Sequence, residues 1–120
     1  MIINATGHEI NVNGVLLQAD GFENMIRLSS PEYLYSINID GIEVAIYNDS
    51  ETLRLPAYEK GTYYVVSRVV AEHNRDRPDL LISDTTKNSV VRLPGGEIYM
   101  VTRLSSLYSG YVDGDSIVHR

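Results

Sequence analysis

The sequence predicts an α+β fold: a mainly antiparallel sheet built of hairpins, shaped as a twisted sheet or small open barrel, with one short helix at about residues 67–74. Two observations predict the hairpins, because Asn13-Gly14 and Asp40-Gly41 each lie between alternating apolar runs. A third predicts the helix, because the apolar residues 62–66 lead directly into a helical pattern. With 120 residues and no linker or repeat, the chain is expected to form a single domain, residues 1–120.

The first expected hairpin covers residues 9–18. A two-residue turn sets a register in which apolar side chains share one face. The expected pairs are Val12 with Val15 and Ile10 with Leu17. Residues 6–8 are expected to form a loop that leads into this hairpin, and residues 25–28 a short strand after it.

The second expected hairpin, residues 33–47, shows the clearest alternation in the chain. Its register predicts one strongly apolar face and an opposite face that carries Asn38 and Glu43. The expected apolar pairs are Ile39 with Ile42, Ile37 with Val44, and Tyr35 with Ile46. Residues 48–60 are polar and contain a proline, so we expect a loop of the length that is often functional in compact domains.

Residues 62–66 are apolar on both faces, which predicts a central strand that is covered on both sides. Helical spacing begins immediately afterwards, with Ser67 at the N-cap position. Asn74–Pro78 is expected to end this helix.

The remaining residues predict more strands. Residues 80–82 are expected to form a short buried strand, and residues 90–93 and 97–104 a hairpin around Pro94-Gly95-Gly96. The segment 108–120 contains a further Asp-Gly turn, between two short terminal strands.

Several function classes are disfavoured by composition. The net charge of -6 argues against a DNA- or RNA-binding protein, which must neutralise phosphates. The absence of cysteine excludes disulfides and thiolate metal sites. We see neither a signal peptide nor a membrane span, and therefore expect a cytoplasmic protein. No phosphate loop, dinucleotide fingerprint or metal-ligand spacing occurs, so we expect no cofactor and no metal.

The cations and the aromatic residues predict a ligand site. Eight of the ten Lys and Arg residues are Arg, and nine of the ten aromatic residues are Tyr. Arg holds phosphate through two parallel hydrogen bonds, and Tyr offers a flat apolar surface with a polar tip. We therefore expect a small phosphate-bearing ligand, gripped by Arg68, Arg77 and Arg92. The candidate ligand-binding residues are Tyr64, Ser67, Arg68, Arg77, Asp84, Thr85, Arg92, Arg103 and His8.

Purely structural interpretations stand beside these candidates. Ser67 would cap the helix, although a helix N-terminus there would also attract an anion. Arg77 would pair with Asp76 or Asp79 on the surface. The arginines of the last hairpin, Arg92 and Arg103, would pair across strands with Glu97 or a neighbour.

A set of motifs resembles a family of small, largely uncharacterised accessory proteins of tailed phages and prophages. The matching residues span most of the chain: Thr6-x-His8-x-Ile10, Tyr64-Val65-Val66-Ser67 with Val70-Ala71-Glu72, Arg77-Pro78-Asp79-Leu80-Leu81, Asp84-Thr85-Thr86, Ser89-Val90-Val91-Arg92 and Gly96-Glu97-Ile98. The sequence departs from the family pattern at Gly7 and Ser83, where proline is usual, and at Leu93-Pro94, which replaces a charged turn. The family supplies no catalytic residues to carry over.

The resemblance implies a counter-defence factor that acts in the cytoplasm of the host cell. By analogy, such a protein sequesters a nucleotide messenger of bacterial immunity, such as a cyclic ADP-ribose isomer or a cyclic oligonucleotide. Two alternatives stay open: a module that inhibits a host protein through an exposed strand edge, and an enzyme that cleaves such a nucleotide with His8 or His73 and Asp84 as acid–base groups. Leftover sheet edges also predict a homo-oligomer.

Overall fold

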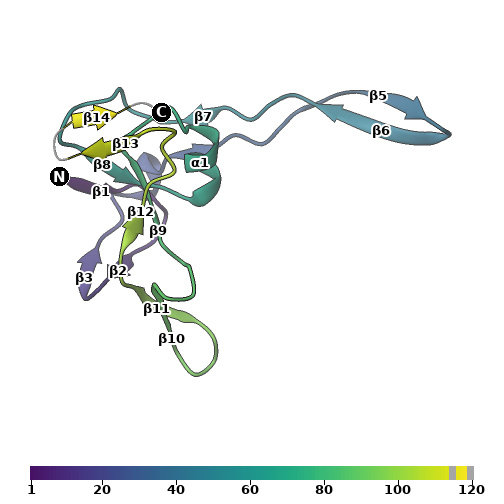
Figure 1. The fold of residues 1–120 in the computed structure, drawn as a ribbon. Coiled ribbons are helices and arrows are strands. Elements are labelled where there is room, and N and C mark those ends of the chain that lie inside the picture. Colours follow the sequence, from purple (N-terminus) through teal and green to yellow (C-terminus); the bar gives the residue numbers. More distant parts are fainter. Residues whose placement is uncertain (114–115, 119–120) are drawn as a thin grey trace.

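The structure, a computed structural model, describes residues 1–113 and 116–118, with side chains described up to residue 110. It is mostly strand, with one short α-helix and one 3₁₀ turn among the described residues (Figure 1). In chain order the elements are β1 (Ile2–Asn4), β2 (Ile10–Val12), β3 (Val15–Leu17), η1 (Phe22–Asn24), β4 (Arg27–Leu28), β5 (Tyr33–Ile39), β6 (Ile42–Tyr47), β7 (Thr52–Leu53), β8 (Tyr63–Val65), α1 (Arg68–His73), β9 (Leu80–Ser83), β10 (Val90–Arg92), β11 (Ile98–Val101), β12 (Leu104–Ser105), β13 (Tyr111–Asp113) and β14 (Ser116–Val118).

The body of the molecule is built on a four-stranded sheet in the order β1-β8-β9-β12. β8 pairs in parallel with β1 on one side and with β9 on the other, while β12 is antiparallel to β9. The expected central position of β8 is confirmed, and its Val65 is fully buried. The sequence did not predict the edge strand β1, formed by residues 2–4, whereas the expected loop at residues 6–8 is confirmed.

Helix α1 connects the parallel strands β8 and β9 and packs on their sheet. It buries Val70 and Ala71. The hydrophobic core joins helix and sheet and consists of Ala5, Ile26, Val66, Val70, Ala71, Leu80 and Ile82. Ser67 occupies the N-cap position in an extended conformation, as the sequence predicts, but its hydroxyl makes no capping hydrogen bond.

A second four-stranded sheet, in the order β10-β11-β2-β3, extends from the body (Figure 1). Its β2–β3 hairpin has the predicted register, and Asn13 and Gly14 have φ of 51° and 90°. Positive φ at both positions is the signature of the type I′ turn. β11 joins β2 in parallel through the pair Val101 and Val12.

The β5–β6 hairpin projects far from the body as a long arm (Figure 1). Its register is the predicted one, with a bulge at Leu34 and positive φ at Asp40 and Gly41. The arm lengthens the molecule to 54 × 40 × 31 Å. The radius of gyration is 17.5 Å, whereas a compact chain of this length has one of about 14 Å.

Other differences from the expected fold come from pairing between distant segments. The expected loop 48–60 contributes β7, which pairs with β4. The expected long strand 97–104 is interrupted, and its end, β12, pairs with β9. The described strands form two four-stranded and three two-stranded sheets, none closed into a barrel. The predicted turn at Asp113-Gly114 lies partly outside the described residues, but the strands beside it, β13 and β14, do pair.

Candidate ligand-binding cavity

A cavity of about 340 Å³ lies at the carboxyl ends of the three parallel strands. The segments that follow β1, β8 and β9 contribute Thr6–His8, Val66–Arg68 and the pair Ser83 and Thr85 to its wall. Parallel strands end at the same edge of a sheet, and the loops beyond that edge are the usual ligand-binding position in α/β proteins. The β8-α1-β9 unit therefore gives this small domain a binding edge that its hairpins alone would lack.

The cavity has an apolar floor and a polar rim. Its floor includes the buried residues Ile10, Ile26, Val66 and Ile82. The polar rim residues are Thr6, His8, Arg27, Ser67, Arg68 and Thr85. An apolar wall with a few polar groups around it is the common composition of small-molecule sites.

Asn4, at the end of β1, holds the first rim loop in place. Its side chain is buried, and its amide Nδ2 donates to the carbonyl oxygens of His8 and Leu17, each at 2.8 Å. Its Oδ1 accepts hydrogen bonds from the backbone N–H and the hydroxyl of Thr6. All four hydrogen bonds serve the loop and its neighbouring strand, so the backbone that presents His8 is set before any ligand arrives.

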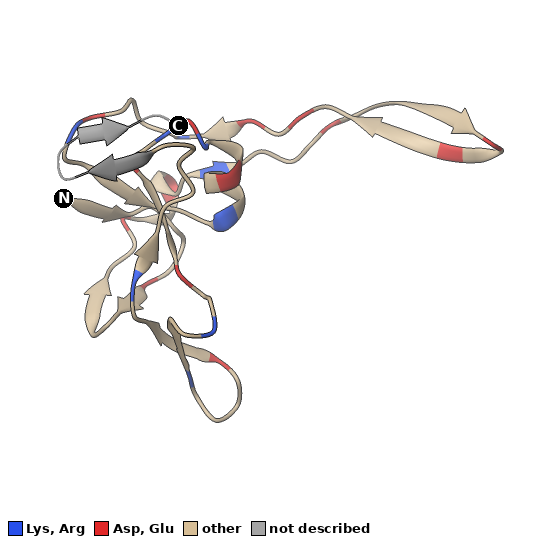
Figure 2. Ribbon diagram, viewed as in Figure 1, with Lys and Arg blue, Asp and Glu red and all other residues tan. Residues whose placement is uncertain are grey.

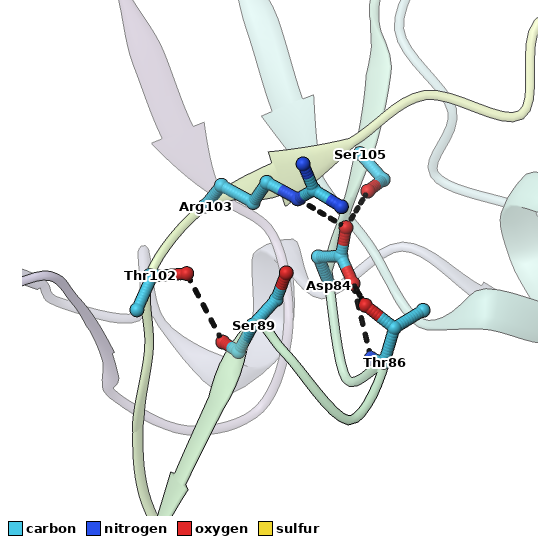
Figure 3. A network of polar contacts seen from close by, with 6 residues as sticks. All are labelled: Asp84, Thr86, Ser89, Thr102, Arg103 and Ser105. Atoms are coloured by element: carbon cyan, nitrogen blue, oxygen red, sulfur yellow. Dashed lines mark hydrogen bonds and ion pairs between the residues drawn. The ribbon is translucent and has the colours of Figure 1, made fainter.

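Asp84, just after β9, holds the second rim loop in the same way (Figure 3). Its Oδ1 accepts from the backbone N–H of Thr86 at 3.0 Å and from the Thr86 hydroxyl at 2.5 Å. Its Oδ2 accepts from Arg103 Nε and Ser105 Oγ, each at 2.7 Å. Thr85, between the two residues of this turn, is thereby positioned on the cavity wall.

These contacts keep Asp84 ionised. Hydrogen bonds from Thr86 and Ser105, and one from Arg103, hold the pKa of the Asp84 carboxyl well below its usual range, although burial acts in the opposite direction. Asp84 is therefore a structural anion with its acceptor sites occupied, and it is poorly suited to hold or release a catalytic proton near neutral pH.

Arg68 is an accessible cation of the cavity. Its Nε donates to Glu72 at 2.8 Å, but the two side chains are 65% and 43% exposed. Exposed ion pairs of this kind contribute about 0–1 kcal/mol. The guanidinium can therefore exchange Glu72 for an incoming phosphate at little cost.

A second cavity of about 430 Å³ adjoins the first and shares His8, Ile10, Ser83 and Thr85 with it. Its far side includes Tyr99, on β11, which is 57% exposed. The base of the β10–β11 hairpin is fixed by Thr102, whose N–H donates to the Ser89 carbonyl at 2.7 Å and whose hydroxyl contacts the same oxygen at 3.4 Å (Figure 3). The two cavities together offer a continuous surface on both sides of His8.

The structure brings four of the nine predicted ligand residues to one cavity: His8, Ser67, Arg68 and Thr85. Asp84 and Arg103 lie next to it, in the ion pair that supports the second loop. The partner of Arg103 is thus Asp84 and not the expected Glu97.

Three predicted residues lie elsewhere. Arg77 donates to both carboxylate oxygens of Asp79 and to the Pro56 carbonyl. Asp79 is one of the expected partners, but the pair is buried and not on the surface. Arg92 donates to the Gly96 carbonyl within its own hairpin. Tyr64 lines a separate cavity of about 300 Å³. The three arginines that were expected to grip phosphates, Arg68, Arg77 and Arg92, therefore do not share one site within a single chain.

Sequence reasoning missed Thr6 and Arg27 as rim residues. Thr6 carries a usable signal, because an Asn-x-Thr segment after a short apolar run forms a side-chain-supported turn. The same pattern, Asp84-x-Thr86, occurs after β9. Arg27 carries no local signal, because it reaches the rim through the pairing of β4 with β7.

Neither a metal-binding cluster nor a hydrogen-bonded Ser–His pair forms at the rim among the described residues. Among the described residues, no group of three or more His, Asp or Glu side chains could hold a metal ion. Ser67 and His8 line the same cavity, but no hydrogen bond joins their side chains in the described part of the chain.

Within residues 1–113 and 116–118, no helix combines the length and the apolar character needed to cross a membrane.

Comparison with known proteins adds no assignment. No family model, no curated protein and no solved structure matches the chain.

Proposed function

We propose that the protein binds a small phosphate-bearing nucleotide in the cavity at the carboxyl ends of β1, β8 and β9, and releases it unchanged. One observation carries this proposal. Four of the predicted ligand-binding residues, His8, Ser67, Arg68 and Thr85, come from three separate segments and line one cavity.

The rim and floor suit the parts of a nucleotide. Arg68 and Arg27 supply guanidinium groups for a phosphate. The hydroxyls of Thr6, Ser67 and Thr85 can exchange hydrogen bonds with sugar oxygens. The apolar floor takes one base, and the adjoining cavity offers Tyr99 as a stacking surface for another.

The adjoining cavities favour a ligand with two nucleotide units or a cyclised dinucleotide. Pockets for small molecules commonly measure about 300–1,000 Å³. The first cavity measures about 340 Å³ and the second about 430 Å³, so each lies within this range. Together with the resemblance to phage accessory proteins, this supports a sponge for a nucleotide messenger of bacterial immunity, such as a cyclic ADP-ribose isomer or a cyclic oligonucleotide, acting in the host cytoplasm.

The environment of Asp84 supports binding without turnover. The nucleotide-cleaving alternative uses Asp84 as an acid–base group, but this carboxylate accepts four hydrogen bonds and has a lowered pKa. A group whose lone pairs are committed to its own loop does not activate water or protonate a leaving group efficiently.

The direct test is recovery of intact ligand. The purified protein is incubated with a panel of cyclic and linear nucleotides, washed, and denatured, and the released compound is identified by mass spectrometry. We expect unchanged ligand, and a thermal shift at saturation, since a ligand at 100 times its Kd stabilises a protein by about 2.7 kcal/mol. Recovery of a cleaved product would favour the enzyme, and no binding by any nucleotide would contradict the proposal.

A further inference from the structure

The projecting arm, residues 32–49, exposes a continuous apolar sheet face. The six side chains of this face are Tyr35, Ile37, Ile39, Ile42, Val44 and Ile46. Four of them are strongly exposed, from 43% at Ile37 to 66% at Ile42. In the described part of the chain, β5 and β6 pack extensively only against each other.

An uncovered face of this kind is not expected of a free hairpin in water. An isolated two-stranded hairpin is at best marginally stable, and large contiguous apolar patches on soluble proteins mark interaction surfaces. The regular pairing along β5 and β6 therefore indicates that another surface covers the apolar face in the working protein.

The charge of the arm restricts what that surface can be. Within residues 32–49 there are four acidic residues, Glu32, Asp40, Glu43 and Asp49, and neither Lys nor Arg. Figure 2 shows only red charged positions on the arm, whereas blue positions lie on the body, including around α1. Glu43 lies on the opposite face of the arm. Two arms packed on their apolar faces would still bring only acidic residues near each other at the turn and the base, which is unfavourable.

The body of the same chain has the complementary properties. It contains all the described Lys and Arg residues, together with most of the acidic residues. It also exposes large apolar side chains of its own, among them Phe22 at 72% and Val69 at 57%. Val69 lies on α1 beside the exposed Arg68. One chain thus contains an apolar arm whose charged residues are all acidic, and a body with exposed apolar groups and all the described cations. A reciprocal exchange of arms would bring these surfaces together.

The area is sufficient for a stable oligomer. Half-exposed Tyr and Ile side chains leave on the order of 100 Å² each, so the two arms of an exchanged dimer would bury roughly 1,000 Å² and an equal area of the bodies. This total reaches the range of stable interfaces, whereas a single arm laid on a foreign protein would bury about half of it.

We propose that the arm packs on the body of a second copy of this chain, and that reciprocal exchange of arms makes the protein a homo-oligomer. The proposed partner surface includes the exposed Val69 and the adjacent Arg68. Arg68 also lines the cavity, but the test of this inference needs no ligand.

The first experiment measures the molar mass of the full chain by size-exclusion chromatography with light scattering. We expect at least twice the 13.4 kDa of one chain, and dissociation toward one chain mass in the double variant Ile37→Thr/Ile42→Thr. Threonine keeps the β-branched shape that favours strands but removes apolar contact. The matched control, Ser36→Thr/Asn38→Thr, changes the opposite face of β5 and should keep the wild-type mass.

A wild-type protein that is monomeric at micromolar concentration would overturn the proposal, and so would an oligomer that the double variant leaves intact. If the double variant fails to fold, a second measurement on near-native protein decides. A photoreactive benzoylphenylalanine at position 35 is incorporated, and ¹⁵N-labelled and unlabelled chains are mixed and irradiated. We expect cross-links that join position 35 of one chain to residues 1–31 or 52–110 of a chain with the other label. Cross-links between the arms of two differently labelled chains would overturn the exchange. The absence of any cross-link between differently labelled chains would also overturn it.

Discussion

The arm and the body of this protein use their apolar residues in opposite ways. The arm has the most regular apolar alternation in the sequence, yet in one chain most of its apolar face is exposed. The body has short, irregular strands of two to four residues, yet it contains the hydrophobic core. Side-chain alternation therefore specifies which residues share a face of a strand. Whether that face is buried depends on whether segments from elsewhere in the chain pack against it.

Polar contacts divide in the same way. The body encloses Asn4, Asp79 and Asp84, and each of these buried side chains has hydrogen-bond partners. The polar contacts of the arm are exposed, such as the 2.9 Å hydrogen bond between the Tyr33 and Ser36 hydroxyls. We therefore expect substitutions in the body to change the free energy of unfolding, and those in the arm to change association.

The largest effect is expected at the buried ion pair of the body. Replacing Arg77 by Met would leave the carboxylate of Asp79, which is 0% exposed, without its bidentate partner. Breaking such a pair from one side costs about 3–5 kcal/mol, which urea denaturation would measure. The matched control is Arg68→Met, which breaks the exposed pair with Glu72 and should cost less than about 1 kcal/mol. Equal losses in both variants would contradict the distinction.

The apolar contrast is tested by one truncation in each region. Leu80→Ala removes a side chain that is 2% exposed in the core, and should cost about 2–5 kcal/mol in unfolding free energy. Ile42→Ala removes a comparable side chain that is 66% exposed on the arm. Measured at a concentration where the protein is monomeric, it should cost under about 1 kcal/mol. A large loss from Ile42→Ala in the monomer would show that the arm packs within its own chain.

Ligand affinity sharpens the comparison within the body. Arg68→Gln removes a guanidinium from the rim of the cavity, and a hydrogen bond to a charged group contributes about 1.5–3 kcal/mol. We expect Kd for the bound nucleotide to rise roughly 10- to 100-fold in calorimetric titration. The control Arg75→Gln changes an exposed arginine that follows α1 and does not line the cavity. Loss of affinity in the control alone would place the ligand elsewhere.

The smallest effect is expected in the pH dependence of stability. The pKa of Asp84 is lowered by folding, so its contribution is present above the pKa of the unfolded state, about 4, and is lost as the pH falls below that value. Asp84→Asn should therefore be less stable than the wild type at pH 7, with a difference that shrinks from about pH 5 downward. Urea midpoints at pH 7, 4 and 2.5 measure this. A difference that stays constant, or grows, on acidification would contradict the ionised role of Asp84.

The candidate site could be predicted only in part. Ser67 and Arg68 follow the central strand and Thr85 follows the next strand of the sheet, so sequence order alone placed them at one sheet edge once β8 and β9 were parallel. Arg77 was misplaced for a physical reason: it lies before β9, at the opposite end of that strand, where Asp79 and the Pro56 carbonyl take its donors. Nothing in the local sequence distinguishes an arginine that faces a cavity from one that faces a buried carboxylate.

By itself the sequence determined the two hairpins with their registers, the N-cap at Ser67, the short helix after β8, and the strand-rich class of the fold. These features depend on turn residues and side-chain alternation within a few positions. Only the tertiary structure decided that β1, β8 and β9 run parallel, that β4 meets β7, and that the arm leaves the body. These features depend on contacts between residues far apart in the chain. The free energy of such contacts comes from burying apolar side chains of both segments together, and no periodic pattern in the sequence shows which segments will meet.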